Sequence, residues 1–403
     1  MPADRRQPSV TDGAQSGADV LIIGAGIVGA ATAWALAEAD LRVHVLEQGP
    51  VNRGGSGATA GNLHIQAVHS ERPGQVAPLD AGRLLPLQRA ASDLWATTED
   101  RLQADIGVRR PGGFTVAETE EEVTLLTAKR SLEIRHGIPT EIIGGADLRR
   151  QAPEVSPSVL AATWCELDGY ANPLTVTPAF LAAAVSRGAR VDAFRPVIAL
   201  AREGEYWRAD TPTGPVRAPV VINAAGSDVW RITRMAGVEL AARPAHLQMH
   251  ITTRTGLRLP HLVQHIGQGL SVKQLPTGQV LIGGGWPASE RVAAEGRYRA
   301  SMASVAGNLS LACRVIPAIA DLDLLRVWTG PVLATADELP VIGEVPGRPG
   351  LLVCGGTYAF TLAPLWAEVL SSMVLQKPTP VPVEDLGPAR LMPPPGARHG
   401  DRA

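Results

Sequence analysis

The clearest hydrophobic pattern lies near the start of the chain. Residues 20–23 are four apolar residues without a polar interruption, which is typical of a strand buried on both faces. An alanine-rich segment with apolar residues at helical spacing follows over residues 27–39, and residues 41–46 form a second apolar strand. Strand, helix and strand in this order predict a β–α–β unit with parallel strands.

Three glycines stand between the first strand and the helix, in the spacing Gly24-x-Gly26-x-x-Gly29. In a dinucleotide site the first glycine permits a tight turn, the second lets a pyrophosphate approach the backbone, and the third lets the helix pack on the strand. Glu47 ends the second strand, where a carboxylate can accept hydrogen bonds from ribose hydroxyls. A glycine-rich turn of another α/β protein is the alternative, but the complete order of elements favours the dinucleotide site.

Further apolar segments predict two domains. The expected strands and helices are residues 112–117, 118–135, 177–187, 190–193, 197–201, 220–226, 247–252, 270–274, 279–286, 325–330, 351–354 and 361–375. Segments 270–274 and 279–286 read as a hairpin, with Ser271 and Lys273 on one face and Val272 on the other. The Pro-rich stretch after Gln376 is expected to extend over the surface.

Composition excludes several classes of protein. The 403 residues allow two or three domains, and the net charge of -2 without a basic stripe argues against nucleic acid or an anionic membrane as the main partner. No apolar run is long enough for a transmembrane helix. The three cysteines are far apart and the histidines are scattered, so no metal site is expected. Free thiols suit a reducing cytoplasm, and residues 1–17 read as a polar tail because no apolar segment follows Arg5-Arg6.

A second glycine-rich stretch, residues 53–64, contains almost only small residues before Leu63 and His64. Small residues cannot pack a core, but they suit a loop and helix start against which a flat ligand lies. Gly57 and Gly61 permit a close approach of backbone and ligand. A flexible surface loop is the alternative, which the apolar residues that follow disfavour.

The fingerprint, Glu47 and this stretch resemble the D-amino-acid-oxidase superfamily of FAD-dependent oxidoreductases, over about residues 18–391. Residues 60–66 most resemble the flavin subunit of opine (octopine/nopaline) oxidases and of hydrogen cyanide synthase. The resemblance implies an α/β fold: a discontinuous, Rossmann-type FAD-binding domain with an inserted, largely antiparallel α+β substrate domain. The expected boundaries are 18–85, 150–235 and 325–380 for the FAD domain, 86–149 and 236–324 for the substrate domain, and 1–17 and 381–403 for tails.

The resemblance also implies a set of FAD contacts. The histidine that tethers FAD covalently in some relatives matches Ala58, so non-covalent FAD is expected. The expected contacts are Gly24, Ala25, Gly26, Ile27, Val28, Gly29, Glu47, Gln48, Gly57, Ala58, Thr59, Gly61, Asn62, Leu63, Val197, Ala225, Gly226, Gly356, Tyr358 and Thr361.

Several of these positions have more than one interpretation. Thr361 is expected to cap the helix that follows it, with the helix start directed at the flavin. Asn223, in a strand end that resembles the Asn-Ala-Ala-Gly motif of the family, either stabilises the turn or contacts the cofactor. Asp168 and Asn172 are expected to serve as turn and cap residues.

The chemistry that the resemblance implies is oxidation of the C–N bond of a secondary amine or amino acid (opine-, proline- or glycine-like) to an imine, by hydride transfer to flavin N5. Lys273, Tyr358 and His64 are the catalytic candidates. Lys273 either lies near the flavin or faces solvent, and Tyr358 either lines the site or is a packed aromatic. Val332 stands where many relatives have the arginine that grips the substrate carboxylate.

Three functional hypotheses remain open from the sequence. In the first, the chain is the catalytic subunit of a heteromeric amine dehydrogenase, with a second flavoprotein subunit and a small iron–sulfur subunit as partners. In the second, it resembles a glycine or sarcosine oxidase and uses O2 directly. In the third, it is a non-catalytic, flavin-binding electron-transfer subunit.

Overall fold

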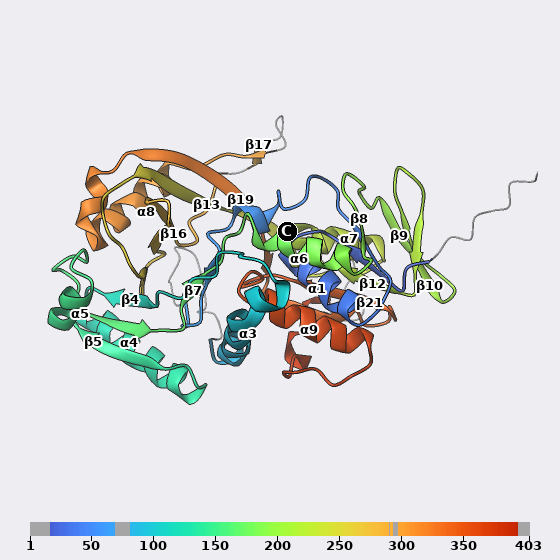
Figure 1. The fold of residues 1–403 in the computed structure, drawn as a ribbon, viewed down its shortest axis with the longest axis horizontal. Coiled ribbons are helices and arrows are strands. Elements are labelled where there is room, and N and C mark those ends of the chain that lie inside the picture. The colour runs from blue at the N-terminus through green and yellow to red at the C-terminus, as the bar shows by residue number, and fades with distance from the viewer. Residues whose placement is uncertain (1–16, 69–80, 290, 293–296, 394–403) are drawn as a thin grey trace, which may run out of the picture.

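The computed structural model describes residues 17–68, 81–289, 291–292 and 297–393. A six-stranded sheet with its helices occupies one half of the molecule, and an eight-stranded sheet occupies the other half (Figure 1). The chain passes between the two halves several times, so segments far apart in the sequence contribute to each half. This α/β arrangement confirms the fold class that the sequence predicts.

The six-stranded sheet is built around the first apolar run. Its strands are, in spatial order, β20 (Val341–Glu344), β21 (Leu351–Gly355), β12 (Val220–Asn223), β1 (Val20–Ile23), β2 (Val43–Leu46) and β8 (Arg190–Asp192). All neighbours are parallel except β20 and β21. Because side chains alternate along a strand, Val20 and Ile22 face one core and Leu21 and Ile23 face another. Both faces are therefore buried, as an uninterrupted apolar run predicts.

Different elements cover the two faces of this sheet. Helices on one face include α1 (Ile27–Glu38), α3 (Ala81–Leu102), α6 (Val176–Ser186) and α9 (Ala363–Val374). The other face is covered by a three-stranded sheet and a short helix, which are β9 (Ala199–Glu203), β10 (Tyr206–Asp210), β11 (Val216–Ala218) and α7 (Val229–Met235). In Figure 1, α1, α6 and α9 lie together in the right half of the molecule.

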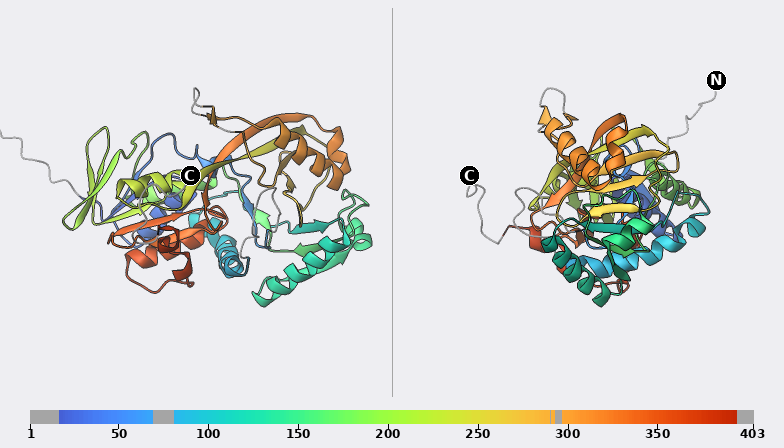
Figure 2. Two further views of the ribbon diagram at one scale, coloured as in Figure 1. Left: turned by 180° about the vertical axis from the view of Figure 1, so that it is seen from behind. Right: turned by 90° about the vertical axis from the view of Figure 1, so that its left-hand side faces the viewer.

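The eight-stranded sheet is antiparallel except where β14 pairs with β4. Its strands, in spatial order, are β19 (Leu324–Thr335), β13 (Ala242–Arg254), β16 (Gln279–Gly283), β15 (Ser271–Gln274), β14 (Leu262–His265), β4 (Gly113–Ala117), β6 (Ala161–Cys165) and β5 (Thr140–Gly144). One face packs on α5 (Gly145–Gln151) and α8 (Met302–Val315). Helix α4 (Glu120–Arg135) packs on β4, β6 and β5 at one end of the sheet, and Figure 2 shows this end from behind.

Several shorter elements complete the structure. They are α2 (Gly55–Ala58), β3 (Asn62–Leu63), β7 (Gly169–Tyr170), η1 (Gly226–Asp228), η2 (Pro317–Asp321), β17 (Arg291–Val292) and β18 (Arg297–Tyr298). The segment expected as a Pro-rich tail forms η3 (Glu384–Leu386) and η4 (Pro388–Leu391), and the side chains of Leu386 and Leu391 are buried against the six-stranded sheet half. The expectation of a purely extended segment there is wrong, because these leucines find apolar partners. Of the expected tails, residues 1–16 and 394–403 lie outside the described residues.

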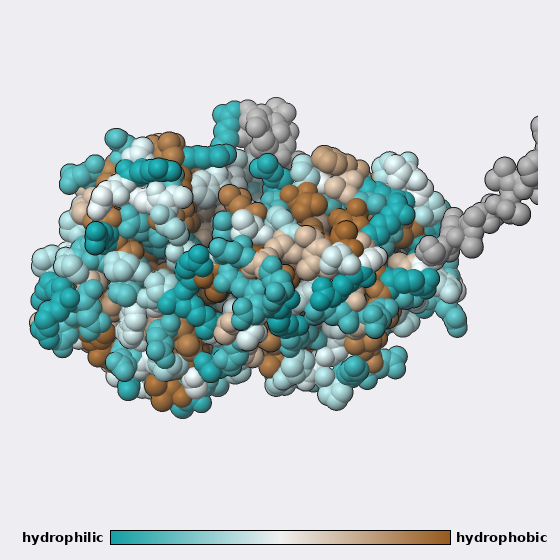
Figure 3. Space-filling model, viewed as in Figure 1, coloured by the Kyte–Doolittle hydropathy of each residue, from teal (hydrophilic) through white to brown (hydrophobic). Residues whose placement is uncertain are grey.

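The surface is mixed in character. Figure 3 shows apolar residues in small groups between polar residues on one face of the molecule. Within the described part of the chain, no helix has the length and apolar character needed to cross a membrane.

Candidate flavin site

A cavity of about 670 Å³ joins the two halves of the molecule. Gly24 and Glu47 line it at the carboxyl ends of β1 and β2, while Gln264 and Ser271 line it on the eight-stranded sheet. Its volume lies within the range of about 300–1,000 Å³ that is common for small-molecule sites. A ligand that binds along this cavity would contact both halves.

The fingerprint glycines are required by the backbone around them. Gly24 has φ +107°, and a Cβ atom there would lie 2.5 Å from the carbonyl oxygen of Ala224. A Cβ on Gly29 would lie 2.0 Å from the carbonyl oxygen of Gly24. The turn between β1 and α1 is therefore too tight for side chains, and the start of α1 stays open to the cavity.

Ser56 contributes to this helix start, and the sequence analysis did not identify it. Its Oγ accepts a hydrogen bond of 2.9 Å from the backbone N–H of Ile27, in the first turn of α1. Helix starts with free N–H groups bind phosphate groups well. The only sequence signal for this role is that Ser56 lies within a stretch of small residues. Its distance of 29 residues from Ile27 in the sequence does not indicate a contact with α1.

Glu47 stabilises the same turn from the other side. One of its carboxylate oxygens accepts from the N–H of Ala25 at 2.9 Å, and the other accepts from the N–H of Gly49 at 3.0 Å. Each carboxylate oxygen can accept more than one hydrogen bond, so both retain capacity for hydroxyl donors in the cavity. The expected position of Glu47 at the end of the second strand is thus matched by the geometry.

Gly57 and Gly61 serve the chain itself. A Cβ on Gly57 would lie 2.0 Å from the oxygen of Asn52, and one on Gly61, which has φ +73°, would lie 2.2 Å from the oxygen of Ala171. The backbone of Asn52 and of Ala171, and not a ligand, therefore lies against these two glycines. Neither glycine lines the cavity.

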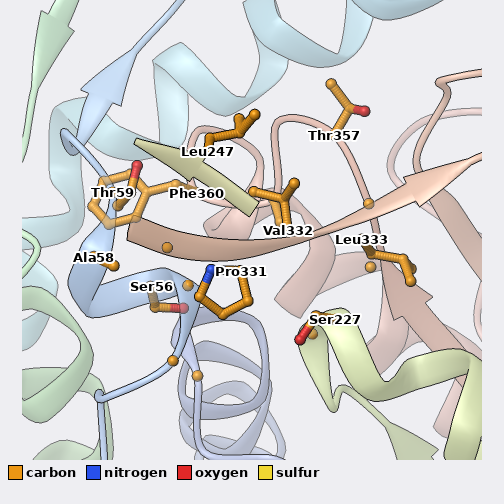
Figure 4. Close-up of a pocket in the computed structure, with 18 of the residues that line it drawn as sticks. Ser56, Ala58, Thr59, Ser227, Leu247, Pro331, Val332, Leu333, Thr357 and Phe360 are labelled. Carbon is orange, nitrogen blue, oxygen red and sulfur yellow. The ribbon is translucent and has the colours of Figure 1, made fainter. Parts of the chain in front are cut away.

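Most of the predicted cofactor contacts lie on the cavity wall. These are Gly24, Gly26, Ile27, Val28, Glu47, Gln48, Ala58, Thr59, Asn62, Val197, Ala225, Gly226, Gly356, Tyr358 and Thr361. Ala25, Gly29 and Leu63 lie behind this wall, as do the two glycines just described. Figure 4 shows Ser56, Ala58, Thr59 and the β19 residues Pro331 and Val332 around part of the cavity.

Lys273 is buried, with only 3% of its surface exposed, so the solvent-facing alternative is wrong. Its Nζ donates hydrogen bonds to the oxygen of Ala60 and to Oδ1 of Asn62, the latter at 2.7 Å. It also lies 4.4 Å from the centre of the Tyr170 ring. Burial holds the pKa of Lys273 well below its usual value. The side chain stops short of the cavity and holds the 60–62 loop.

The contacts of Asn62 define the state of His64. Because Oδ1 of Asn62 accepts from Lys273, its Nδ2 is the donor, which lies 2.6 Å from Oγ of Ser271 and 3.4 Å from Nε2 of His64. Nε2 of His64 is then the accepting nitrogen and Nδ1 carries the proton. Burial, together with the charge of Lys273, lowers the pKa of His64 to about 4, so the ring is neutral at pH 7.

His64 presents an unused hydrogen-bond donor. Its Nδ1 has no hydrogen-bond partner among the described residues, although the atom is buried and the residue lines the cavity. The Tyr358 ring meets the His64 ring edge-on, with 6.4 Å between ring centres. Tyr358 has φ +59°, a left-handed backbone conformation that is strained for a residue with a large side chain.

Thr361 does not cap α9. The helix begins at Ala363, and its N-cap residue Leu362 has no side-chain hydrogen bond to the helix. Instead, Oγ1 of Thr361 donates to the oxygen of Asn62 at 3.2 Å and accepts from the N–H of His64 at 3.3 Å. The hydroxyl therefore fixes the 62–64 loop, because that loop, and not the helix, offers the nearer backbone groups.

The turn interpretation holds for Asn223, whereas for Asp168 it is wrong, because the Asp168 carboxylate binds a segment more than 100 residues earlier in the chain. The Asn223 amide is fully buried and donates to the oxygen of Val229 and to Oγ1 of Thr233. Asp168 is also fully buried, and it accepts from the N–H groups of Ile65 and Gln66. Neither side chain lines the cavity.

Ala58 and Val332 mark the contact between α2 and β19. The oxygen of Ala58 accepts from Nε1 of Trp328 at 2.8 Å, and a Cβ on Gly330 would lie 2.7 Å from Cβ of Ala58. Val332 lines the cavity and brings no charge to it. Alanine at position 58 offers no nucleophile for a covalent link to a cofactor.

Comparison with known proteins identifies the family. A family model described as DAO, FAD dependent oxidoreductase, matches residues 19–373. The chain belongs to the DAO family of FAD-dependent oxidoreductases. This confirms the resemblance that the sequence motifs indicated.

Two curated relatives span nearly the whole chain. An opine oxidase subunit from Rhizobium meliloti is 25% identical over 364 residues, which are 88% of this chain and 93% of that protein. Glycine oxidase from Geobacillus kaustophilus is 27% identical over 379 residues, which are 93% and 96% of the two chains. The crystal structure of that glycine oxidase superposes with a TM-score of 0.83 at 26% identity, covering 93% of this chain and 98% of that one.

An L-proline dehydrogenase from P. horikoshii shares the fold, with a TM-score of 0.83 at 22% identity, over 93% of this chain and 97% of that one. These findings show an FAD-dependent amine or amino-acid oxidoreductase. The residues present fit the cofactor, since the glycine turn, the open start of α1 and His64, whose Nδ1 has no partner among the described residues, all line one cavity.

Proposed function

We propose that this chain oxidises the C–N bond of a secondary amine or amino acid to an imine, as the catalytic subunit of a heteromeric dehydrogenase. The observation that carries the proposal is the continuity of one cavity from the fingerprint glycines to the eight-stranded sheet. Such a cavity would accommodate a flat cofactor and a small substrate end to end. Opine-, proline- and glycine-like amines are the substrate candidates.

The chain's own residues divide between the two ends of the cavity. The Gly24–Gly29 turn, the start of α1 and Ser56 would hold the pyrophosphate of FAD, and Glu47 would hold a ribose. Loop 58–62 and segment 356–361 would border the flavin ring. Because Ala58 replaces the tethering histidine, we propose that FAD is held non-covalently. Bound FAD supplies the acceptor for the two electrons that leave the amine.

His64 is the residue best placed to act on the substrate. A neutral imidazole does not repel an amine, and its Nδ1–H can donate to a substrate carboxylate. Such a donor is needed because Val332 supplies no positive charge. Lys273 contributes indirectly, since it orients Asn62, which in turn fixes the tautomer of His64.

The heteromeric assignment rests on likeness to proteins that are named as one of the subunits of opine oxidase. A second flavoprotein and a small iron–sulfur protein would then carry the electrons away. Likeness to glycine oxidase, at similar identity, supports the alternative of direct reaction with O2. The two proposals differ in the electron acceptor and in the need for partner subunits.

The test is anaerobic mixing of the FAD-loaded chain with octopine, nopaline, proline derivatives, sarcosine and glycine, while the flavin absorbance is recorded. Bleaching by one of these amines supports the proposed reaction. Readmission of air then separates the two acceptors: slow return of the absorbance favours the partner-dependent dehydrogenase, and fast return with hydrogen peroxide favours the oxidase. A flavin that no compound bleaches contradicts both and favours a non-catalytic electron-transfer role.

A further inference from the structure

A buried ion pair lies outside the flavin site and has no role in the proposed chemistry. Lys129 and Glu133 are one turn apart on α4, 2.7 Å from each other, and their side chains are 4% and 0% exposed. Most other charged residues of α4 face solvent. Because burial of two charges costs free energy that their attraction only partly offsets, such a pair calls for a specific function.

The pair is connected to the cavity wall. The same Glu133 oxygen that meets Lys129 accepts from the N–H of Ala67 at 2.8 Å. Lys129 also donates to Oε1 of Gln66 at 2.7 Å and to Oγ1 of Thr163 at 3.2 Å. Lys129 and Glu133 thus form hydrogen bonds with the consecutive residues Gln66 and Ala67. These belong to the segment 64–68, of which His64, Ala67 and Val68 line the cavity.

Asp168 holds the same segment from the opposite side. Its Oδ1 accepts from the N–H groups of Ile65 and Gln66 at 2.8 and 3.0 Å, and its Oδ2 accepts from Nε2 of Gln66 at 2.9 Å. The three consecutive N–H groups from Ile65 to Ala67 are therefore all bound by buried carboxylates. Hydrogen bonds to ionised acceptors are stronger than neutral ones, which suits a segment that must keep one position.

We propose that Lys129, Glu133 and Asp168 are positioning residues, which fix the wall segment 64–68 so that His64 meets the substrate. The effect on the substrate rests on the proposed amine oxidation. The fixing of segment 64–68 rests on hydrogen bonds alone. The fingerprint end of the cavity does not touch the pair. Loss of the pair should therefore weaken the capture of the amine and leave the binding of FAD unchanged.

The main variant is Lys129→Met with Glu133→Leu, which removes both charges of the pair together. Thr163→Val is a milder variant, which deletes one hydroxyl that donates to Gln66 at 2.8 Å and accepts from Lys129. The matched control is Arg89→Met with Asp93→Leu. This pair has the same spacing on α3 and a similar separation of 3.1 Å, but its side chains are 37% and 61% exposed.

Three quantities are measured on the FAD-loaded proteins: bound FAD per chain, amide hydrogen exchange of the peptide that spans 61–68, and KM and kcat for the amine that bleaches the wild type. In the double variant, exchange of the Ala67 amide, which loses its acceptor on Glu133, should rise on the order of tenfold. KM should rise on the order of tenfold, with kcat changed less than about threefold and FAD content equal to wild type. Thr163→Val should show smaller changes of the same kind, and the control should show none.

Unchanged exchange in both variants would overturn the proposal. Faster exchange with an unchanged KM would also overturn it, because the wall would then be loose without consequence for the substrate. If the wild type oxidises no amine, the proposed function fails, while the exchange measurement still decides whether the pair fixes the wall.

Discussion

The Nζ atom of Lys273 lies 2.7 Å from Oδ1 of Asn62, in the interior of the protein. This contact turns the amide of Asn62 so that its NH2 group points toward His64. A lysine on an exposed hairpin strand would leave both the amide and the histidine tautomer undetermined. The contact therefore links β15 of the eight-stranded sheet to Asn62 on the cavity wall.

Burial of Lys273 makes stability depend on pH in a defined direction. Its folded pKa is lowered from 10.5, so between the lowered value and 10.5 the unfolded chain binds more protons than the folded chain. Stability should therefore rise with pH over this window. In Lys273→Met this contribution disappears, so the melting temperature of wild type relative to the variant should increase from pH 7 to pH 10. Lys377→Met, at an exposed lysine, is the control. If the melting temperatures of wild type and Lys273→Met changed in parallel with pH, the pKa of Lys273 would not be lowered by folding.

His64 gives the corresponding prediction in acid. Its pKa is about 4 in the folded protein against 6.5 normally, so its contribution to stability is present above pH 6.5 and is lost as the pH falls toward 4. The stability of wild type relative to His64→Asn should decline over this window, by at most about 1.4 kcal/mol per pH unit. Thermal melts from pH 4.5 to 8 measure it, with His136→Asn as the control. A constant difference between the two proteins would show that His64 titrates normally.

Gly29 should tolerate no side chain. In Gly29→Ala the new Cβ would meet the oxygen of Gly24 at 2.0 Å, so the turn that carries the phosphate site must open. We expect a loss of more than about 2 kcal/mol of stability and of most bound FAD. Gly144→Ala is the matched control, since no atom lies within 4 Å of its added Cβ. Normal FAD content in purified Gly29→Ala would mean that the cofactor binds elsewhere.

Val332 offers a gain-of-function test. If the cavity lacks a cation for the substrate carboxylate at this position, Val332→Arg should supply one. The KM for sarcosine should then fall on the order of tenfold, with FAD content unchanged. Val332→Leu keeps the position apolar and should leave KM near the wild-type value. An unchanged KM in Val332→Arg would show that the carboxylate is held away from β19.

The sequence predicted what short-range patterns determine. The apolar run of β1, the glycine spacing and Glu47 define the β1–α1–β2 unit without reference to the rest of the chain, and the structure has it at nearly the expected bounds. The hairpin of β15 and β16 was predicted for the same reason. Their shared property is that the partners lie close together in the sequence.

What the sequence could not reveal depends on contacts between distant segments. Ser56 reaches the N–H of Ile27 only because α2 folds back on α1, and Lys273 is buried only because the 60–62 loop, more than 200 residues earlier, offers it two oxygens. Thr361 has the residue type of a cap, yet the same loop takes its hydroxyl. Residue type and spacing carry no information about such partners, so local interpretations of these positions failed or stayed open.

The most direct test of the central claim is the visible absorption spectrum of the purified chain after equilibration with FAD and removal of the excess. We expect about one tightly held FAD per chain and a flavin band that disappears on anaerobic addition of a secondary amine or amino acid. The band should be lost in Gly29→Ala but not in Gly144→Ala. A chain that retains no FAD, or that retains it equally in both variants, would contradict the placement of the cofactor at the Gly24–Gly29 turn.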